Sequence, residues 1–319
     1  MPYGPPGRGP QRPPRKSGGG GWLAVLVVVA VVVVIGLVRA AAQIDVTDHR
    51  ATGPAPSFGY EPRDTGDEPS PPDSTAVTSA TVDVEPAENP MLTDVGATLI
   101  PADCDYSPWG TQVGTARAFF ESAAACLEDA WKPVLADAGL TFTKPNLEVS
   151  ASTEGISTPC TGTTTNFAAF YCPANKTIYM PISQLQTDMF KDNWVIYLSV
   201  FAHEYGHHVQ AASGILLEVN SERVDVGPRS DRGLELSRRV ELQAQCFSGM
   251  YLGSSQDAGS LDSSQISLSI RDANGRGDDR STSRDHGSNE NSGNWFEAGV
   301  EENLTSQCNT FAASDSAVS

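Results

Sequence analysis

The stretch NWVIYLSVFAHEYGHHVQAASG, residues 193–214, decides the fold because it is the clearest helix in the sequence. Its apolar side chains recur at three- and four-residue steps, which is typical of a helix that buries a broad face. Gly214 follows the last residue of the pattern and suits the end of a helix. We therefore predict a buried helix over residues 193–213.

The same helix carries the pattern His203-Glu204-Tyr205-Gly206-His207. Residues four apart share a helix face, so both imidazoles can point at one metal ion. Glu204 lies about 100° around the helix from His203, where it can reach a water molecule without being a ligand. Two histidines, a third protein ligand and an open position form the arrangement of zinc hydrolases. The pattern predicts Zn²⁺ ligands at His203 and His207, with Glu204 as general base.

The third metal ligand has to come from another segment. Glu241 lies 34 residues after His207, on a second helix predicted over residues 234–251, and is the best candidate. Three acids from a predicted loop compete with it: Glu218, Glu222 and Asp225.

A stabiliser for the negative charge on the substrate's carbonyl oxygen is also needed. His286 is the best candidate, because it is the one histidine of residues 96–313 that lies outside this helix. It could instead complete a three-histidine site. Tyr205 and Tyr179 are weaker candidates. The adjacent His208 points off the metal-facing side of the helix, and His49 lies in a spacer.

The remaining pattern of the body indicates a mixture of helices and a small sheet. Residues 111–138 have helical spacing, with Pro133 placed to end or kink the helix. Residues 167–172 and 177–182 flank a turn and predict a hairpin, whose second strand could offer its edge to an extended peptide. Residues 253–292 are polar, and we predict mostly loop with a short helix near residues 265–273.

The six cysteines all lie in the body, which favours disulfide bonds outside the cytoplasm. Local spacing favours the pairs 104–126 and 160–172 and leaves 246–308, although fifteen pairings are open to six cysteines. A metal site built from cysteines is less favoured, because the chain has no Cys-x-x-Cys pair.

The N-terminal third differs from the body in charge and composition. The 319 residues carry a net charge of −18, yet residues 1–38 hold four basic side chains and no acidic one. Residues 22–38 are a 17-residue apolar run, long enough with its uncharged flank to cross a membrane. We predict a cytoplasmic tail (1–17), a single transmembrane helix (18–38), a disordered linker (39–95) and an extracytoplasmic domain (96–313). A cleavable signal peptide, which would release a secreted protein, is the alternative.

Three segments resemble the neutral zinc metallopeptidases of bacteria. They are Phe170-Tyr-Cys-Pro-Ala-Asn-Lys-Thr-Ile-Tyr-Met180, His203-Glu-Tyr-Gly-His-His-Val-Gln210 and Glu241-Leu-Gln-Ala-Gln-Cys-Phe-Ser-Gly249. The resemblance extends from about residue 145 to 311. It implies a zincin-like α+β domain with zinc ligands at His203, His207 and Glu241 and Glu204 as base. It also implies a Cys160–Cys172 disulfide and a strand at residues 177–182 before the active-site helix.

One residue departs from the family pattern. Gln245 stands where the family usually has an aspartate, which would accept the second N–H of a ligating histidine. An amide oxygen can still accept that hydrogen bond without adding charge. We expect weaker zinc binding or lower activity.

The sequence thus predicts a membrane-tethered, zinc-dependent peptidase of α+β class acting on peptides or proteins. Its acidic body disfavours nucleic acid as a partner. Two other hypotheses stay open: a weakened zinc-binding protein that holds peptides or partners at the cell surface, and a disulfide-stapled envelope protein without a metal.

Overall fold

The structure is a computed structural model that describes residues 85–100, 103–162, 167–280, 282 and 284–319. All of these belong to one compact unit. The predicted tail, transmembrane helix and most of the predicted linker lie outside the described residues, and so does His49. Among the residues that are described, none of the helices has the length and apolar character needed to cross a membrane.

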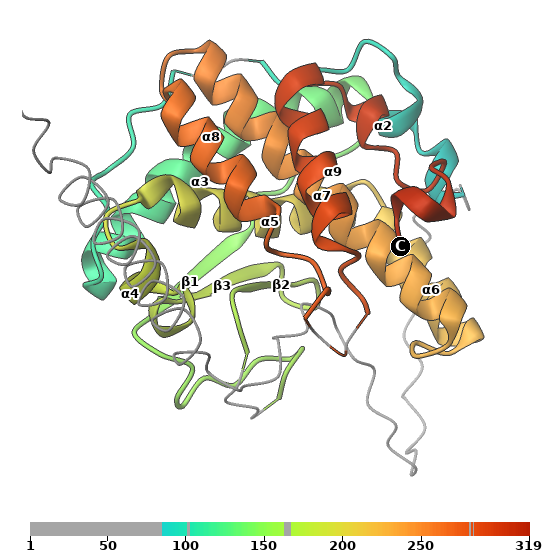
Figure 1. Ribbon diagram of the computed structural model, residues 1–319, viewed down its shortest axis with the longest axis horizontal. Coiled ribbons are helices and arrows are strands. Elements are labelled where there is room, and N and C mark those ends of the chain that lie inside the picture. The colour runs from blue at the N-terminus through green and yellow to red at the C-terminus, as the bar shows by residue number, and fades with distance from the viewer. Residues whose placement is uncertain (1–84, 101–102, 163–166, 281, 283) are drawn as a thin grey trace, which may run out of the picture. The chain divides into compact units, whose positions relative to one another are not determined.

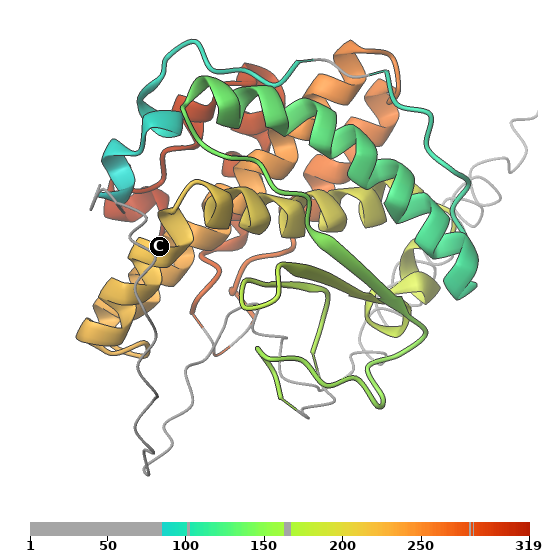
Figure 2. The ribbon, with the colours of Figure 1, turned by 180° about the vertical axis from the view of Figure 1, so that it is seen from behind.

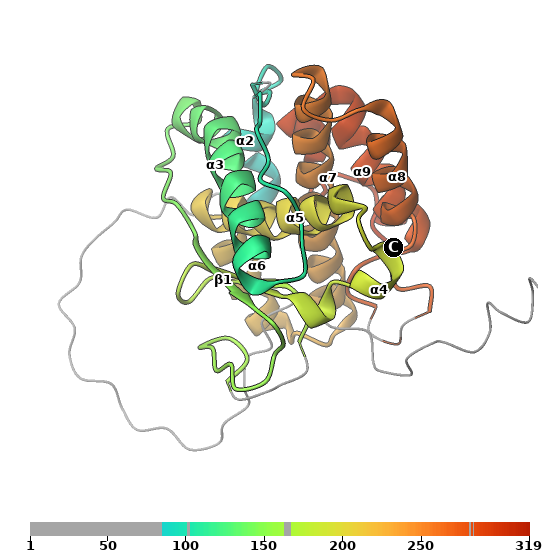
Figure 3. The ribbon, with the colours of Figure 1, turned by 90° about the vertical axis from the view of Figure 1, so that its left-hand side faces the viewer.

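Helix α5, Trp194–Ala212, is the central element, and its predicted bounds are confirmed to within one residue at each end. Figure 3 shows α3, Val113–Asp137, on one side of α5, with α7, Asp231–Asp257, α8, Ser263–Ala273, and α9, Asn289–Glu302, on the other. Large side chains of α5, Phe201 and Tyr205 among them, are completely buried. Because α5 has neighbours on several sides, it forms the core of the domain.

A small sheet lies below α5 in Figure 1. Its strands are β1, Asn146–Ser150, β2, Phe170–Cys172, and β3, Thr177–Pro181, in the order β1-β3-β2. β3 pairs with β1 in parallel and with β2 in antiparallel register, which confirms the predicted hairpin. The expectation that the second strand offers a free edge is wrong, because β3 has a partner on each side. The fold is a mixed helical one with a small sheet, consistent with the predicted α+β class.

Helix α3 and strand β1 lie together on the face seen in Figure 2. The Arg117 guanidinium of α3 donates hydrogen bonds to the carbonyl oxygens of Leu147 (3.3 Å) and Val149 (3.1 Å). Pro133 lies inside α3 and does not end it. The helix stops just before Gly139, which has a φ of +73°.

The structure is more helical than the sequence predicts. α6, Ile215–Val226, replaces a predicted loop, and α7 continues six residues beyond its predicted end at Tyr251. The short elements are η1, Pro86–Glu88, α2, Pro90–Thr93, η2, Ile182–Gln184, α4, Thr187–Phe190, η3, Thr305–Cys308, and η4, Asp315–Ala317.

The packed body also extends past both predicted domain limits. Met91 and Leu92 are buried although we assigned them to the linker, and Val318 is buried beyond residue 313. Thr305 Oγ1 donates to the Met91 carbonyl at 2.5 Å. The domain therefore includes residues before 96 and after 313, because their apolar side chains complete the core.

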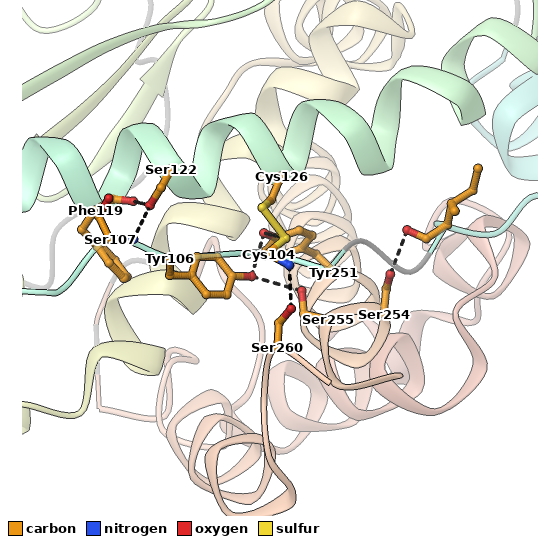
Figure 4. The surroundings of a disulfide bond; sticks show 11 residues. Cys104, Tyr106, Ser107, Phe119, Ser122, Cys126, Tyr251, Ser254, Ser255 and Ser260 are labelled. Carbon is orange, nitrogen blue, oxygen red and sulfur yellow. Dashed lines mark hydrogen bonds between the residues drawn. A yellow bond between two sulfur atoms is a disulfide. The ribbon is translucent and has the colours of Figure 1, made fainter. Parts of the chain in front are cut away.

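All three disulfides follow the pairing that local spacing favours: Cys104–Cys126, Cys160–Cys172 and Cys246–Cys308. Figure 4 shows the first of them joining the segment before α3 to α3 itself. In the same place the hydroxyl groups of Tyr106 and Tyr251 lie 2.9 Å apart, and the Cys104 amide donates to Ser260 Oγ at 2.7 Å. These contacts attach the start of the body to the end of α7.

Helices α7 and α9 pack backbone to backbone at three glycines. A Cβ atom on Gly249 would overlap the carbonyl oxygen of Phe296, and one on Gly299 would overlap that of Cys246. A Cβ on Gly253 would come within 2.5 Å of the Val300 carbonyl oxygen. Glycine lowers the helix propensity of α7. The close packing against α9 that Gly249 and Gly253 permit offsets this cost, which explains why α7 continues past them.

The Gly299→Ala substitution should destabilise the protein by about 1–3 kcal/mol, because backbone atoms cannot move away from the added methyl group. The midpoint of urea unfolding with the disulfides intact measures this. Gly114→Ala in α3 is the matched control, since an added Cβ there has no heavy atom within 4 Å. It should be neutral or slightly stabilising. Equal midpoints for the two variants would contradict the packing argument.

Candidate metal centre

The close approach of α5 and α7 brings the candidate ligands together. Gly206, between His203 and His207, faces α7, where an added Cβ would lie 3.2 Å from the Ala244 Cα. Ala244 follows Glu241 by one helical turn. The absence of a side chain at Gly206 therefore lets the two helices meet at the level of His203, His207 and Glu241.

His203, His207 and Glu241 form a cluster whose donor atoms all lie within 4.8 Å of one another. Glu241 Oε2 is 3.2 Å from His203 Nε2 and 3.3 Å from His207 Nε2. The two imidazole rings are perpendicular, with centroids 4.8 Å apart. The structure thus brings together the three residues that the sequence predicts as ligands.

This donor set fits a divalent cation. Two imidazole nitrogens and one carboxylate oxygen are the protein ligands of a hydrolytic zinc site that keeps an open position. His207 Nε2 is buried and makes no aligned hydrogen bond within the described part of the chain, although the Glu241 oxygen faces it. A nitrogen lone pair and a carboxylate in this arrangement repel each other unless a proton or a metal ion lies between them.

Each imidazole is held at its other nitrogen by a glutamine. His203 Nδ1 lies 3.0 Å from Gln245 Oε1, and His207 Nδ1 lies 2.8 Å from Gln210 Oε1. The expectation that Gln245 contacts a ligating histidine is consistent with this geometry. Gln210 was not predicted as part of the site, although its position three residues after His207, on the same helix face, could have indicated it.

Glu204 lies beside the cluster and is almost completely buried. Burial raises the pKa of its carboxyl to about 8. The backbone N–H of Tyr171 in β2 donates to Glu204 Oε2 at 2.9 Å, which fixes the carboxyl at the sheet. Glu204 is therefore held in place without belonging to the three-residue donor cluster.

The charges of His207 and Glu241 stabilise each other. Burial would raise the pKa of Glu241, but the neighbouring His207 charge and the two imidazoles hold that pKa well below its usual range. Burial would lower the pKa of His207, but Glu241 raises it to about 9. The pKa of His203 is lowered, mainly by burial.

His286 lines a hollow together with His203, Glu204 and Glu241. Its Nδ1 lies 2.7 Å from Asp285 Oδ1 and 3.5 Å from Asp278 Oδ1. Burial alone would lower the pKa of this imidazole, but the two aspartates raise it well above its usual value. The two aspartates therefore favour the protonated form of His286, which lines the same hollow as Glu204.

The other candidates take different places. Glu218, Glu222 and Asp225 lie on α6 rather than in a loop, and within the described residues they join no metal-binding cluster. Glu222 instead pairs with Arg232 at 2.8 Å. Tyr205 is buried in the core, and the Tyr179 hydroxyl accepts from Asn175.

His208 is buried. Its Nε2 donates to the Thr143 carbonyl at 2.5 Å. Burial lowers the pKa of His208 and so favours the neutral ring, in which Nδ1 accepts from the Tyr171 hydroxyl at 3.1 Å. His208 thus supports the residue whose backbone holds Glu204.

Two hollows reach Glu204 and Glu241. One is lined by Phe167, Phe170, Tyr171 and Arg223, together with His207. The other contains His203, Leu242, Arg276 and His286. The two hollows therefore meet at Glu204 and Glu241 from different sides of the donor cluster.

Comparisons with known proteins agree with this geometry. Residues 110–311 match the family described as "Putative neutral zinc metallopeptidase". The Uncharacterized protein YpfJ of Escherichia coli K12 is 30% identical in an alignment of 218 positions, which covers 62% of this chain and 72% of YpfJ. The Uncharacterized protein Rv2575 of Mycobacterium tuberculosis H37Rv is 29% identical in an alignment of 214 positions, which covers 58% of this chain and 67% of that protein. No solved structure gives a significant match. The chain therefore belongs to the putative neutral zinc metallopeptidase family.

Proposed function

We propose that this protein is a zinc-dependent peptidase that hydrolyses peptide bonds, with His203, His207 and Glu241 as metal ligands and Glu204 as general base. The observation that carries the proposal is the convergence of these three donors, from two helices, within 4.8 Å of one another and beside Glu204. Zinc held there would acidify a water molecule and polarise the substrate carbonyl. The family assignment supports zinc as the metal.

Glu204 is suited to carry a proton. Burial raises the pKa of its carboxyl to about 8, so a neighbouring Zn²⁺ would be needed to favour the ionised form that accepts a proton from water. Glu204 takes the proton from the attacking water and delivers it to the leaving amine. The Tyr171 N–H leaves one carboxyl oxygen of Glu204 for that exchange.

His286 stabilises the negative charge that develops on the carbonyl oxygen. Its position in the hollow with Glu204 supports this role, and so do Asp278 and Asp285, which favour the protonated imidazole. The arrangement separates the proton carrier from the group that binds the oxyanion.

The edge of β2 supports an extended peptide as substrate. The Tyr171 N–H points to Glu204 rather than to β3, and in an antiparallel strand the N–H and C=O of one residue point the same way. The Tyr171 carbonyl is thus directed toward the site, where a peptide backbone can bind. The two hollows give room for residues on both sides of the scissile bond.

A second candidate function is a zinc-dependent binding protein that holds peptides or partners with little hydrolysis. Gln245 is the observation that favours it, because an uncharged amide faces His203 where the family pattern has an aspartate. An aspartate would make the imidazole a stronger electron donor to the metal. The presence of Glu204 favours the peptidase.

The Glu204→Gln substitution should leave zinc binding intact and lower hydrolysis by about 10²–10⁴-fold, because the amide cannot accept the proton. Bound zinc and cleavage of an unfolded protein are measured side by side. Glu241→Ala should lose tight zinc binding as well as activity, whereas Glu222→Ala on the surface of α6 should lose neither. Equal activity of wild type and Glu204→Gln would exclude the mechanism, and zinc bound without activity in either would favour the binding protein.

The His286→Ala substitution should lower kcat by about 10²–10³-fold with little change in bound zinc, because the charge acts only on the developing oxyanion. Kinetics on a short peptide and metal analysis test this. Loss of zinc from the variant would instead assign His286 as a metal ligand.

We also propose that residues 18–38 anchor the protein in the cell membrane, with the N-terminus cytoplasmic and the catalytic domain outside. The apolar run with basic residues before it and the three disulfides support this location. The protein should stay with membranes washed at alkaline pH, which removes peripheral proteins. Recovery of a shortened form from the medium would favour signal-peptide cleavage.

A further inference from the structure

A chain of buried amides runs from His207 away from the metal-facing cluster. Its two members are Gln210 on α5 and Gln243 on α7, and both are fully buried. The Gln210 Oε1 atom lies 2.8 Å from His207 Nδ1, and its Nε2 lies 3.0 Å from Gln243 Oε1. Gln210 Nε2 also donates to the Val240 carbonyl at 2.8 Å, and Gln243 Nε2 donates to the Cys308 carbonyl at 3.1 Å.

The direction of every hydrogen bond in this chain is determined by two backbone carbonyls. A carbonyl oxygen can only accept, so the NH₂ groups of Gln210 and Gln243 face Val240 and Cys308. The Gln210 oxygen must then face His207, and Nδ1 of that imidazole must be the donor. This holds for the neutral and the protonated ring alike, since both carry a hydrogen on Nδ1 in this arrangement.

We propose that Gln210 and Gln243 are positioning residues that hold His207 with its Nδ1 hydrogen turned away from the cluster and its Nε2 turned toward Glu241. The inference rests on the proposed zinc site and explains how the protein orients one of its metal ligands before the metal binds. Rotating the Gln210 amide by half a turn would place its NH₂ group against the Nδ1 hydrogen of His207. It would also leave the buried Gln243 Oε1 without a donor, and an unpaired polar group is costly in the interior.

The far end of the chain is fixed covalently. Cys308 is bonded to Cys246, which lies on α7 three residues after Gln243. The disulfide keeps the Cys308 carbonyl against the same turn of α7. The two amides therefore fix the orientation of the His207 ring relative to the Cys308 carbonyl. Because they are uncharged, they add no negative charge to a site that already contains Glu204 and Glu241.

The test compares Gln210→Leu and Gln243→Leu, which keep the size of the side chain, with Gln184→Leu at an exposed position. The zinc dissociation constant is measured by competition with a chelator. The His207 ring is observed by NMR of protein labelled with ¹⁵N-histidine, which reports whether the Nδ1 hydrogen is protected from exchange. Chain folding is followed by thermal unfolding without metal.

Gln210→Leu should raise the zinc dissociation constant by about 10–100-fold and remove the protection of the Nδ1 hydrogen. Gln243→Leu should have a smaller effect in the same direction, because Gln210 keeps its bond to Val240, and Gln184→Leu should have none. An unchanged dissociation constant and unchanged protection in folded Gln210→Leu protein would overturn the proposal. If that variant fails to fold, Gln243→Leu decides by the same two measurements.

Glu241→Ala separates this inference from the proposed function. It should lose zinc yet keep the Nδ1 hydrogen of His207 protected, because the amide chain is intact. Wild-type protein that binds no zinc but shows a protected Nδ1 hydrogen would contradict the zinc site and leave the orienting chain supported. An Nδ1 hydrogen that stays protected in both glutamine variants would contradict the proposal that Gln210 and Gln243 orient His207.

Discussion

The close contact between α5 and α7 at Gly206 and Ala244 is the constraint on which the site depends. Two of the three clustered donors come from α5 and the third from α7, so the separation of the helices sets the distances among them. An added Cβ on Gly206 would lie 3.2 Å from the Ala244 Cα, tighter than side chains usually pack. The glycines that join α7 to α9 secure α7 from its opposite side.

The two carboxyl groups of the site have opposite electrostatic surroundings. Glu241 faces two imidazoles, and the charge of His207 keeps its pKa low, while burial raises the pKa of Glu204 to about 8. A pair of acids whose pKa values are driven apart in this way can divide the work of holding a cation and moving a proton. The difference arises from geometry alone, since both residues are glutamates on neighbouring helices.

Much of the fold and of the candidate site could be predicted, because the underlying signals are local. Helix α5 and the hairpin follow from apolar spacing, and the pairing of Cys104 with Cys126 and of Cys160 with Cys172 follows from short separations. Helix α6 and the continuation of α7 were missed, because Gly and polar residues hide a helix that tertiary contacts stabilise. The burial of Met91 and Leu92 depends on contacts with distant residues, which local composition does not reveal.

The sequence by itself determined the residue types of the site and their placement on one helix face, because the four-residue spacing of His203 and His207 requires only helical periodicity. Only the tertiary structure brings Glu241, rather than the acids of α6, next to the two histidines, since that contact depends on which helix packs against Gly206. It likewise placed His286 between two aspartates and connected His207 to Gln210, Gln243 and Cys308. Such contacts join residues far apart in the chain, and their distances exist only after the helices have packed.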